Sequence, residues 1–253
     1  MLHTYELSNL LAPVIHRANT KSNILADRAA LYVLEKLGIN TQHNTPLLQQ
    51  NNLLARCQWI DQQLLSYFQE YPKTECIEVN GGLSTRFHRL SEKSDWPQFS
   101  WCTINSHDIN DCLQYVFPKL DNYCSIGDNN SLISWQKHIH WNSRKNKVLI
   151  LGEYQSVQSW NDFTALYVNI QKSLTSQTPY LDIILTHQIN NFPTLCMNHK
   201  LSTDIISSQN AHPKSTYFIS LINRIFYLKN NSTKEFTCHL KIVKQNSQEN
   251  NNA

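Results

Sequence analysis

I-E-V-N-G-G-L-S-T-R-F-H-R-L, residues 77–90, is the most informative stretch of the sequence. Its first residues continue a short β-prone run that begins at Cys76, and two adjacent glycines then end the run. Only five of the 253 residues are glycine, so a pair at a strand end indicates a backbone need, such as a positive φ or the close approach of a ligand. Taken alone, the pair also fits an ordinary turn. Helix-compatible sequence follows, which is typical of the ligand-binding turn of an open α/β sheet.

Apolar runs and helical segments alternate along the chain, which predicts a mainly parallel sheet with helices on both faces. The last two apolar runs are joined by the short polar segment 230–233, which leaves no room for a helix. We therefore expect these two runs to form an antiparallel hairpin at the edge of the sheet. The seven expected strands cover residues 76–79, 99–104, 123–126, 147–151, 180–189, 225–228 and 236–243.

Helical periodicity over residues 10–37, with Gly38 as a stop, predicts a helical cap before the sheet. The Gln/Asn-rich segment 41–52 is expected to be a loop, and a helix is expected over 53–71. A chain of this length can bury one core, so we expect a single domain over 1–245 with its cap at 1–52 and its α/β core at 53–245. The polar tail, residues 246–253, is expected to be disordered.

Composition excludes several classes of protein. Lys and Arg total 22 against 19 Asp and Glu, which is too balanced to indicate a nucleic-acid-binding or membrane-binding surface. The seven cysteines are scattered without a Cys-x-x-Cys pair, which favours reduced, buried thiols over disulfides or zinc. There is no apolar run long enough to span a membrane and no secretory signal pattern. These features together predict a cytoplasmic protein without a metal.

Several motifs resemble those of the leucine carboxyl methyltransferase and polyketide O-methyltransferase family. The stretch 77–90 is similar to the family's V-N-L-G-A-G-L-D-T-R-x-x-R-L, and residues 55–61 resemble its A-R-x-x-x-x-D helix. Residues 13–29 resemble its P-x-x-x-R-A…D-P-x-A pattern. Further along, W-C-T-I-N, S-I-G-D and L-G-E stand where the family has W-x-E-V-D, a strand-end Asp and I-A-E-G. Motifs in this order are more specific than any one of them alone.

The resemblance implies a Rossmann-like class I methyltransferase fold with S-adenosylmethionine as cofactor. It implies methyl transfer to a carboxylate or hydroxyl oxygen of a small molecule or peptide terminus. Arginines would bind the cofactor's carboxylate in bidentate fashion, the glycine turn would approach the cofactor, and residues at the following strand ends would bind its ribose, adenine and methionine parts. In chain order, the implied contacts are Arg17, Arg56, Asn80, Gly81, Gly82, Asn105, Asp128 and Glu153.

Departures from the family pattern support a second interpretation. Asn80 replaces the first glycine of the turn, Ser84 replaces an Asp, and Thr103 and Asn105 replace both acids of the second strand. A member with these changes could have kept the fold, lost catalysis and become a binding or scaffold protein. Arg56, Asp128 and Glu153 argue against this interpretation, although Asp128 could equally cap the next helix.

Two small clusters have simpler explanations than a binding site. Arg86, His88, Arg89 and Lys93 form a basic cluster that is too small to indicate nucleic-acid binding, so we expect no nucleic acid as a partner. His138 and His140 have a spacing that suits one face of a strand, but no third metal ligand is predicted, so exposed polar histidines are the preferred explanation.

Overall fold

A computed structural model of the chain describes residues 4–19, 27–39, 47–94, 96–128, 134–141, 143–151, 159–178, 180–187, 203–208 and 236–243. Its centre is a seven-stranded sheet in the order β3-β2-β1-β4-β5-β7-β6. All neighbours among the first five strands in this order are parallel, whereas β7 runs antiparallel to β5 and to β6. The strands are β1 (Glu75–Val79), β2 (Ser100–Asn105), β3 (Tyr123–Gly127), β4 (Lys147–Leu151), β5 (Tyr180–His187), β6 (Thr203–Ser208) and β7 (Phe236–Val243). The expected mostly parallel α/β architecture is confirmed.

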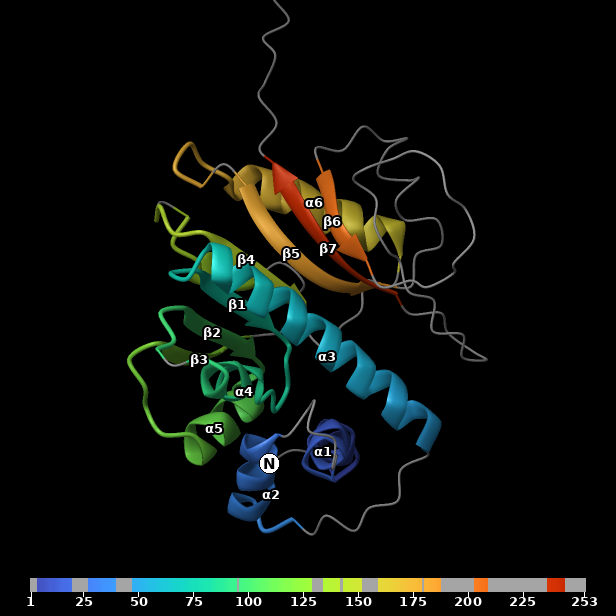
Figure 1. The fold of residues 1–253 in the computed structure, drawn as a ribbon. Helices are drawn as coiled ribbons and strands as arrows, with labels where there is room; N and C mark the ends of the chain where they lie inside the picture. The colour runs from blue at the N-terminus through green and yellow to red at the C-terminus, as the bar shows by residue number, and fades with distance from the viewer. Residues whose placement is uncertain are drawn as a thin grey trace, which may run out of the picture.

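The helices lie on both faces of this sheet (Figure 1). α3 (Leu47–Glu70) and α4 (Arg86–Glu92) pack on one face, where their apolar side chains meet those of β1, β2, β4 and β5. α6 (Trp160–Ser173) packs on the other face, against an apolar surface that runs from β2 to β7. Burial on both faces explains why β4 continues after Lys147 as the uninterrupted apolar run V-L-I-L, since a strand covered on both sides needs no polar alternation.

A third apolar cluster forms where the N-terminal helices meet the glycine turn. α1 (Thr4–Asn19) and α2 (Arg28–Lys36) pack with α5 (His107–Val116) around Leu83. Gly38 ends α2 with a φ of 64°, and its N–H donates to the carbonyl of Glu35 at 3.0 Å. A left-handed residue at this position terminates a helix at little cost when it is glycine. The cap thus consists of two described helices that hold one side of the turn.

Two expectations about elements are wrong. The segment 47–52, expected as a loop, forms the first turns of α3, because leucine and glutamine are good helix formers and outweigh the asparagines. The strand beside β7 at the sheet edge is β6, not residues 225–228, which lie outside the described residues. The expected antiparallel pair at the sheet edge is confirmed, but the strand that pairs with β7 at this edge is residues 203–208.

No helix within the described residues is both long and apolar enough to span a membrane.

Candidate functional site

The turn after β1 has an unusual backbone. Asn80 has a φ of 53° and Gly82 a φ of 59°, both in the left-handed region that favours glycine and tolerates asparagine. Gly81 between them has no room for a side chain, because a Cβ there would lie 2.8 Å from the carboxyl carbon of Glu78. The backbone N–H of Asn80 donates to the carbonyl of Ile104 at 2.8 Å, which ties the turn to β2. The glycine pair is therefore a structural requirement of a tight strand-to-helix turn.

The end of β2 is attached to this turn through Asn105. Its Oδ1 accepts the N–H of Gly82 at 3.0 Å, and its Nδ2 donates to Oγ1 of Thr103 at 2.9 Å. Asn105 is fully buried and Thr103 is nearly so. Among the described residues, these two bonds use one lone pair and one N–H of the Asn105 amide, which has two of each. That combination suits a hydroxyl group, which both donates and accepts.

A third polar group follows β3, the strand next to β2. Asp128 is 3% exposed and accepts hydrogen bonds from Nζ of Lys137 at 3.1 Å and from Nε2 of His138 at 2.8 Å. Its backbone N–H donates to the carbonyl of Asn105 at 2.7 Å, so the two predicted nucleoside-binding residues are neighbours. A Cβ on Gly127 would lie 2.5 Å from Nδ1 of the exposed His107, so a side chain at position 127 would have to displace the His107 ring. The ends of β1, β2 and β3 thus bring polar groups to one place, as expected for parallel strands.

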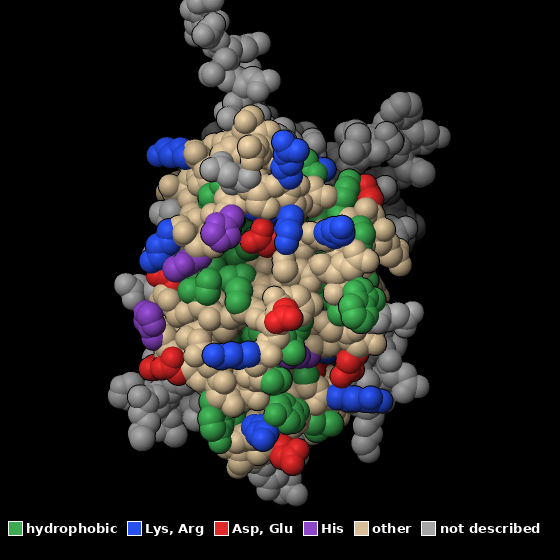
Figure 2. Space-filling view, turned by 90° about the vertical axis from the view of Figure 1, so that its left-hand side faces the viewer, with side chains coloured by type: hydrophobic (Ala, Val, Ile, Leu, Met, Phe, Trp, Pro, Cys, Tyr) green, Lys and Arg blue, Asp and Glu red, His purple; other side chains and the backbone are tan. Residues whose placement is uncertain are grey.

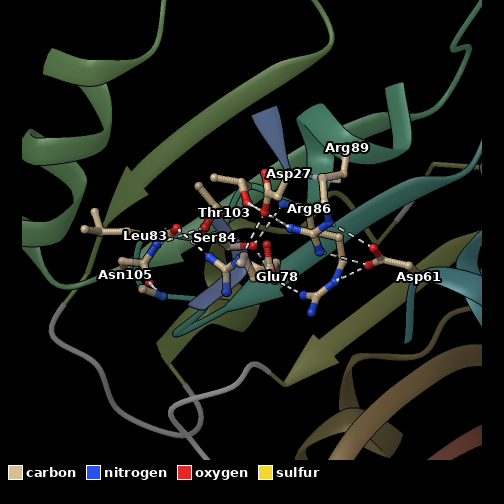
Figure 3. Close-up of polar contacts among 12 residues, drawn as sticks. Asp27, Asp61, Glu78, Leu83, Ser84, Arg86, Arg89, Thr103 and Asn105 are labelled. Carbon is tan, nitrogen blue, oxygen red and sulfur yellow. Dashed lines mark hydrogen bonds and ion pairs between the residues drawn. The ribbon is translucent and has the colours of Figure 1, made fainter. Parts of the chain in front are cut away.

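Beneath the turn lies a buried cluster of three arginines and three carboxylates, drawn in Figure 3. Asp61 of α3 accepts from Nε of Arg86 at 3.1 Å and from Nε of Arg89 at 3.0 Å. Arg86 also pairs with Glu78 of β1. Arg89 reaches Asp27 at 2.8 Å, and Asp27 in turn pairs with Arg17 at 3.1 Å.

The charges of this cluster balance formally, which offsets the cost of burying them. Burial alone would raise the pKa of the Asp27 carboxyl, but Arg89 and Arg17 outweigh burial and hold that pKa below its ordinary value. Burial would lower the pKa of Arg89, and Asp61 and Asp27 outweigh it in the same way. Both shifts favour the charged forms of Asp27 and Arg89. The ion pairs of the cluster link α1, α2, α3, β1 and α4.

The two predicted carboxylate-binding arginines occupy different surroundings. Arg17 is 1% exposed and belongs to the buried cluster, where it also donates to the carbonyl of Leu83 at 3.3 Å. Arg56 is half-buried on α3, five residues before Asp61. Arg17 therefore holds the cap helices against the turn, whereas Arg56 lies nearer to solvent. Glu153 lies outside the described residues.

The structure also places three further groups of side chains. Arg86 and Arg89 of the small basic cluster are buried in ion pairs with Asp61. His138 contacts Asp128, and among the described residues no group of three or more His, Cys, Asp or Glu could hold a metal. Cys124 is exposed, although the sequence predicts buried cysteines.

Sequence reasoning missed the partners in the buried cluster. Asp27 and Asp61 stand in motifs that resemble the family's, but nothing in those motifs indicates that they meet. The signal available was the pair Arg86 and Arg89, spaced three apart in a stretch of buried apolar residues, since arginine in such a place needs carboxylate partners. Nothing in the sequence indicates that Lys137 and His138 contact Asp128.

Comparison with known proteins supports the fold. No protein-family model and no curated protein matches the chain. A putative methyltransferase from Thermobifida fusca superimposes with a TM-score of 0.53 at 9% identity, covering 96% of this chain and 100% of that one. MtNAS in complex with MTA and tNA gives a TM-score of 0.44 at 8% identity over 96% of this chain and 78% of that one. TrmK of M. capricolum, in complex with S-adenosyl-homocysteine, gives 0.44 at 6% identity over 76% and 72%. Together with the strand order, the first of these shows that the chain has the Rossmann-like fold of class I methyltransferases.

Proposed function

We propose that the chain binds S-adenosylmethionine beyond the carboxyl ends of β1, β2 and β3 and transfers its methyl group to an acceptor oxygen. The observation that carries this proposal is the turn after β1, in which Asn80 and Gly82 adopt left-handed φ values around a glycine that admits no side chain. Turns of this kind let backbone N–H groups approach a ligand at the edge of an α/β sheet.

The polar groups around the turn fit a nucleoside. Asn105 keeps one donor and one acceptor for ribose hydroxyls, and Asp128 lies beside it to accept from an adenine amino group. Arg56 is the better candidate for the cofactor's carboxylate, because it is half-buried, whereas Arg17 is 1% exposed inside the buried cluster. Glu153 would complete the methionine side of the site.

The chemistry requires little beyond alignment. S-adenosylmethionine supplies a methyl group on a positively charged sulfur, which is reactive without further activation by the protein. The residues of the turn and the strand ends would hold the acceptor oxygen in line with that methyl group and exclude water. A carboxylate acceptor needs no general base, whereas a hydroxyl acceptor must lose a proton. We propose a carboxylate or hydroxyl of a small molecule or peptide terminus, as implied by the resemblance to the leucine carboxyl methyltransferase and polyketide O-methyltransferase family.

The surface charges and the free thiols support a small acceptor and a cytoplasmic location. Basic and acidic side chains alternate on the face drawn in Figure 2 without a patch of one sign, which favours a small acceptor over a nucleic acid. All cysteines whose side chains the structure describes are free, which suits the cytoplasm.

A second function, a binding or scaffold protein that kept the fold without catalysis, is favoured by a separate observation. Gly81, Gly82, Asn105 and Asp128 are all buried, and the N–H of Gly82 is already bonded to Asn105. A nucleoside would have to displace whatever covers these groups. An aspartate at position 105 would leave a full negative charge for the ribose, but an amide gives up the charge-assisted part of that bond.

Calorimetric titration of S-adenosylmethionine into the wild-type chain and into two variants separates the two functions. Asn105→Asp keeps the shape and restores the charge, so it should tighten binding about fivefold, equivalent to about 1 kcal/mol. Asn105→Leu removes both ribose contacts and should weaken binding at least about tenfold. Asn161→Asp, the same chemical change at an exposed position on α6, is the matched control and should leave the affinity unchanged. If the wild type does not bind and Asn105→Asp gains nothing, the enzymatic proposal is wrong and the scaffold function stands.

A further inference from the structure

Two cysteines face each other on neighbouring strands, away from the buried ion cluster. Cys102 of β2 and Cys124 of β3 are direct partners in the parallel register, so their side chains project from the same face of the sheet. Adjacent strands lie about 4.8 Å apart, and disulfides form across Cα separations of about 4.4–6.8 Å. The register thus places the two Cα atoms at a typical strand spacing, which lies within the range of Cα separations in disulfides.

The two thiols differ in their access to solvent. β3 is the edge strand at its end of the sheet, and Cys124 on it is exposed. Cys102 is half-buried and packs against the apolar cluster that lies under α6. A reagent from solvent therefore reaches Cys124 first, with Cys102 directly behind it.

The surroundings of Cys102 and Cys124 shift the pKa values of the two thiols in opposite directions. A hydrogen bond between the two thiols lowers the pKa of Cys124 and raises the pKa of Cys102. The nearby carboxylate of Glu75 acts in the raising direction on the pKa of both thiols, and Nζ of Lys147 lies 3.0 Å from that carboxylate. Because the thiolate is the reactive form, Cys124 is the attacking group and Cys102 the resolving one.

We propose that Cys102 and Cys124 form a redox site that closes reversibly to a disulfide when the chain meets a small-molecule disulfide such as oxidised glutathione. The Cys124 thiolate attacks one sulfur of that disulfide, forms a mixed disulfide and releases one glutathione thiolate. Cys102 then attacks the Cys124 sulfur, the second glutathione leaves as a thiolate, and the released thiolates take up the two thiol protons. The protein loses two hydrogens and the small disulfide becomes two thiols, so atoms and electrons balance.

The other cysteines whose side chains the structure describes lack this arrangement. Cys57 and Cys76 are fully buried. Cys112 on α5 is half-buried, and burial raises the pKa of its thiol. Disulfides in cytosolic proteins are most often transient and redox-sensing, which is the role that an exposed thiol with a resolving partner fits.

The chain with the Cys102–Cys124 disulfide should melt at a higher temperature than the reduced chain. A disulfide between these strands closes a loop of about twenty residues, and such cross-links raise the melting temperature by about 5–10 °C in a chain of this size. Asn105 and Asp128 follow the two cysteines at the ends of the same strands, so closure also fixes their spacing. The disulfide itself does not depend on the proposed function, since the test below uses no cofactor.

The test exposes the full-length chain to oxidised glutathione, blocks free thiols, and maps cross-links by mass spectrometry without reduction. Cys102 and Cys112 fall in one tryptic peptide, so the Cys112→Ser variant identifies the partner. We expect the cross-link and the rise in melting temperature in the wild type and in Cys112→Ser, reversal of both by a reducing agent, and neither effect in Cys124→Ser. Loss of the cross-link in Cys112→Ser would overturn the proposal. A wild type that stays as a stable glutathione adduct on Cys124 would overturn it as well.

Discussion

Replacing Asp61 with asparagine tests whether the buried ion cluster holds the site together. Asp61 accepts three hydrogen bonds from two arginines: Nε of Arg86 at 3.1 Å, and Nε and Nη2 of Arg89 at 3.0 and 3.1 Å. The side chains of all three residues are at most 2% exposed. Asparagine has the same shape but no charge, and one of its two terminal atoms is a donor that faces the arginines.

The expected loss of stability follows from the missing charge. Removing one partner of a buried ion pair costs about 3–5 kcal/mol, because the remaining charges are left buried and uncompensated. Asparagine keeps one acceptor, so we expect about 3 kcal/mol, to be measured as the free energy of unfolding in urea. The matched control is Asp111→Asn on the exposed side of α5, where the same change should alter stability by at most about 0.5 kcal/mol. A loss of unfolding free energy below about 1 kcal/mol for Asp61→Asn would refute a stabilising buried ion cluster, since a loss of that size is expected of a solvent-exposed ion pair.

Two other predictions concern buried polar groups elsewhere. Burial lowers the pKa of His88 from 6.5 to about 4. The unfolded chain therefore protonates His88 at a higher pH than the folded chain does. The contribution of neutral His88 to stability is complete above pH 6.5 and is lost as the pH falls toward 4. Between roughly pH 7.5 and pH 5 this should remove about 2 kcal/mol of unfolding free energy, and His88→Phe should abolish that part of the pH dependence, whereas the exposed His140→Gln should not. Separately, the Tyr67 hydroxyl donates to Oδ2 of the fully buried Asp182 at 2.7 Å. Tyr67→Phe should therefore lower the melting temperature by an amount equivalent to about 2 kcal/mol. An unchanged melting temperature would show that the hydrogen bond to Asp182 does not stabilise the fold.

Much of the fold could be predicted because its signals are local. The apolar run 147–151 predicts β4 to the residue, and the serine before Trp160 caps α6 through a reciprocal pair of hydrogen bonds with Asp162. The glycine pair marks the turn at the end of β1 for the same reason. Each of these features depends on neighbouring residues alone.

The features that were missed depend on contacts between distant parts of the chain. β6 reads T-D-I-I-S-S and lacks a strand's usual apolar alternation, so only its pairing with β7 defines it. Asp27 and Asp61 meet the arginines of α4 across 62 and 28 positions of sequence, respectively, and no local pattern encodes such a meeting. Asn105 was identified as a departure from the family pattern, but its bond to the N–H of Gly82 follows only from the geometry of the strand ends.

The central claim, that the turn after β1 cradles a nucleoside cofactor, is tested most directly by recording amide resonances of the isotope-labelled chain during titration with S-adenosylhomocysteine. We expect the backbone signals of Gly81 and Gly82 and the side-chain amide signal of Asn105 to shift together with a single affinity, because all three surround the same turn. If these signals stay in place at saturating ligand, or if shifts are confined to strands on the far side of the sheet, the turn does not bind the cofactor and the claim is contradicted.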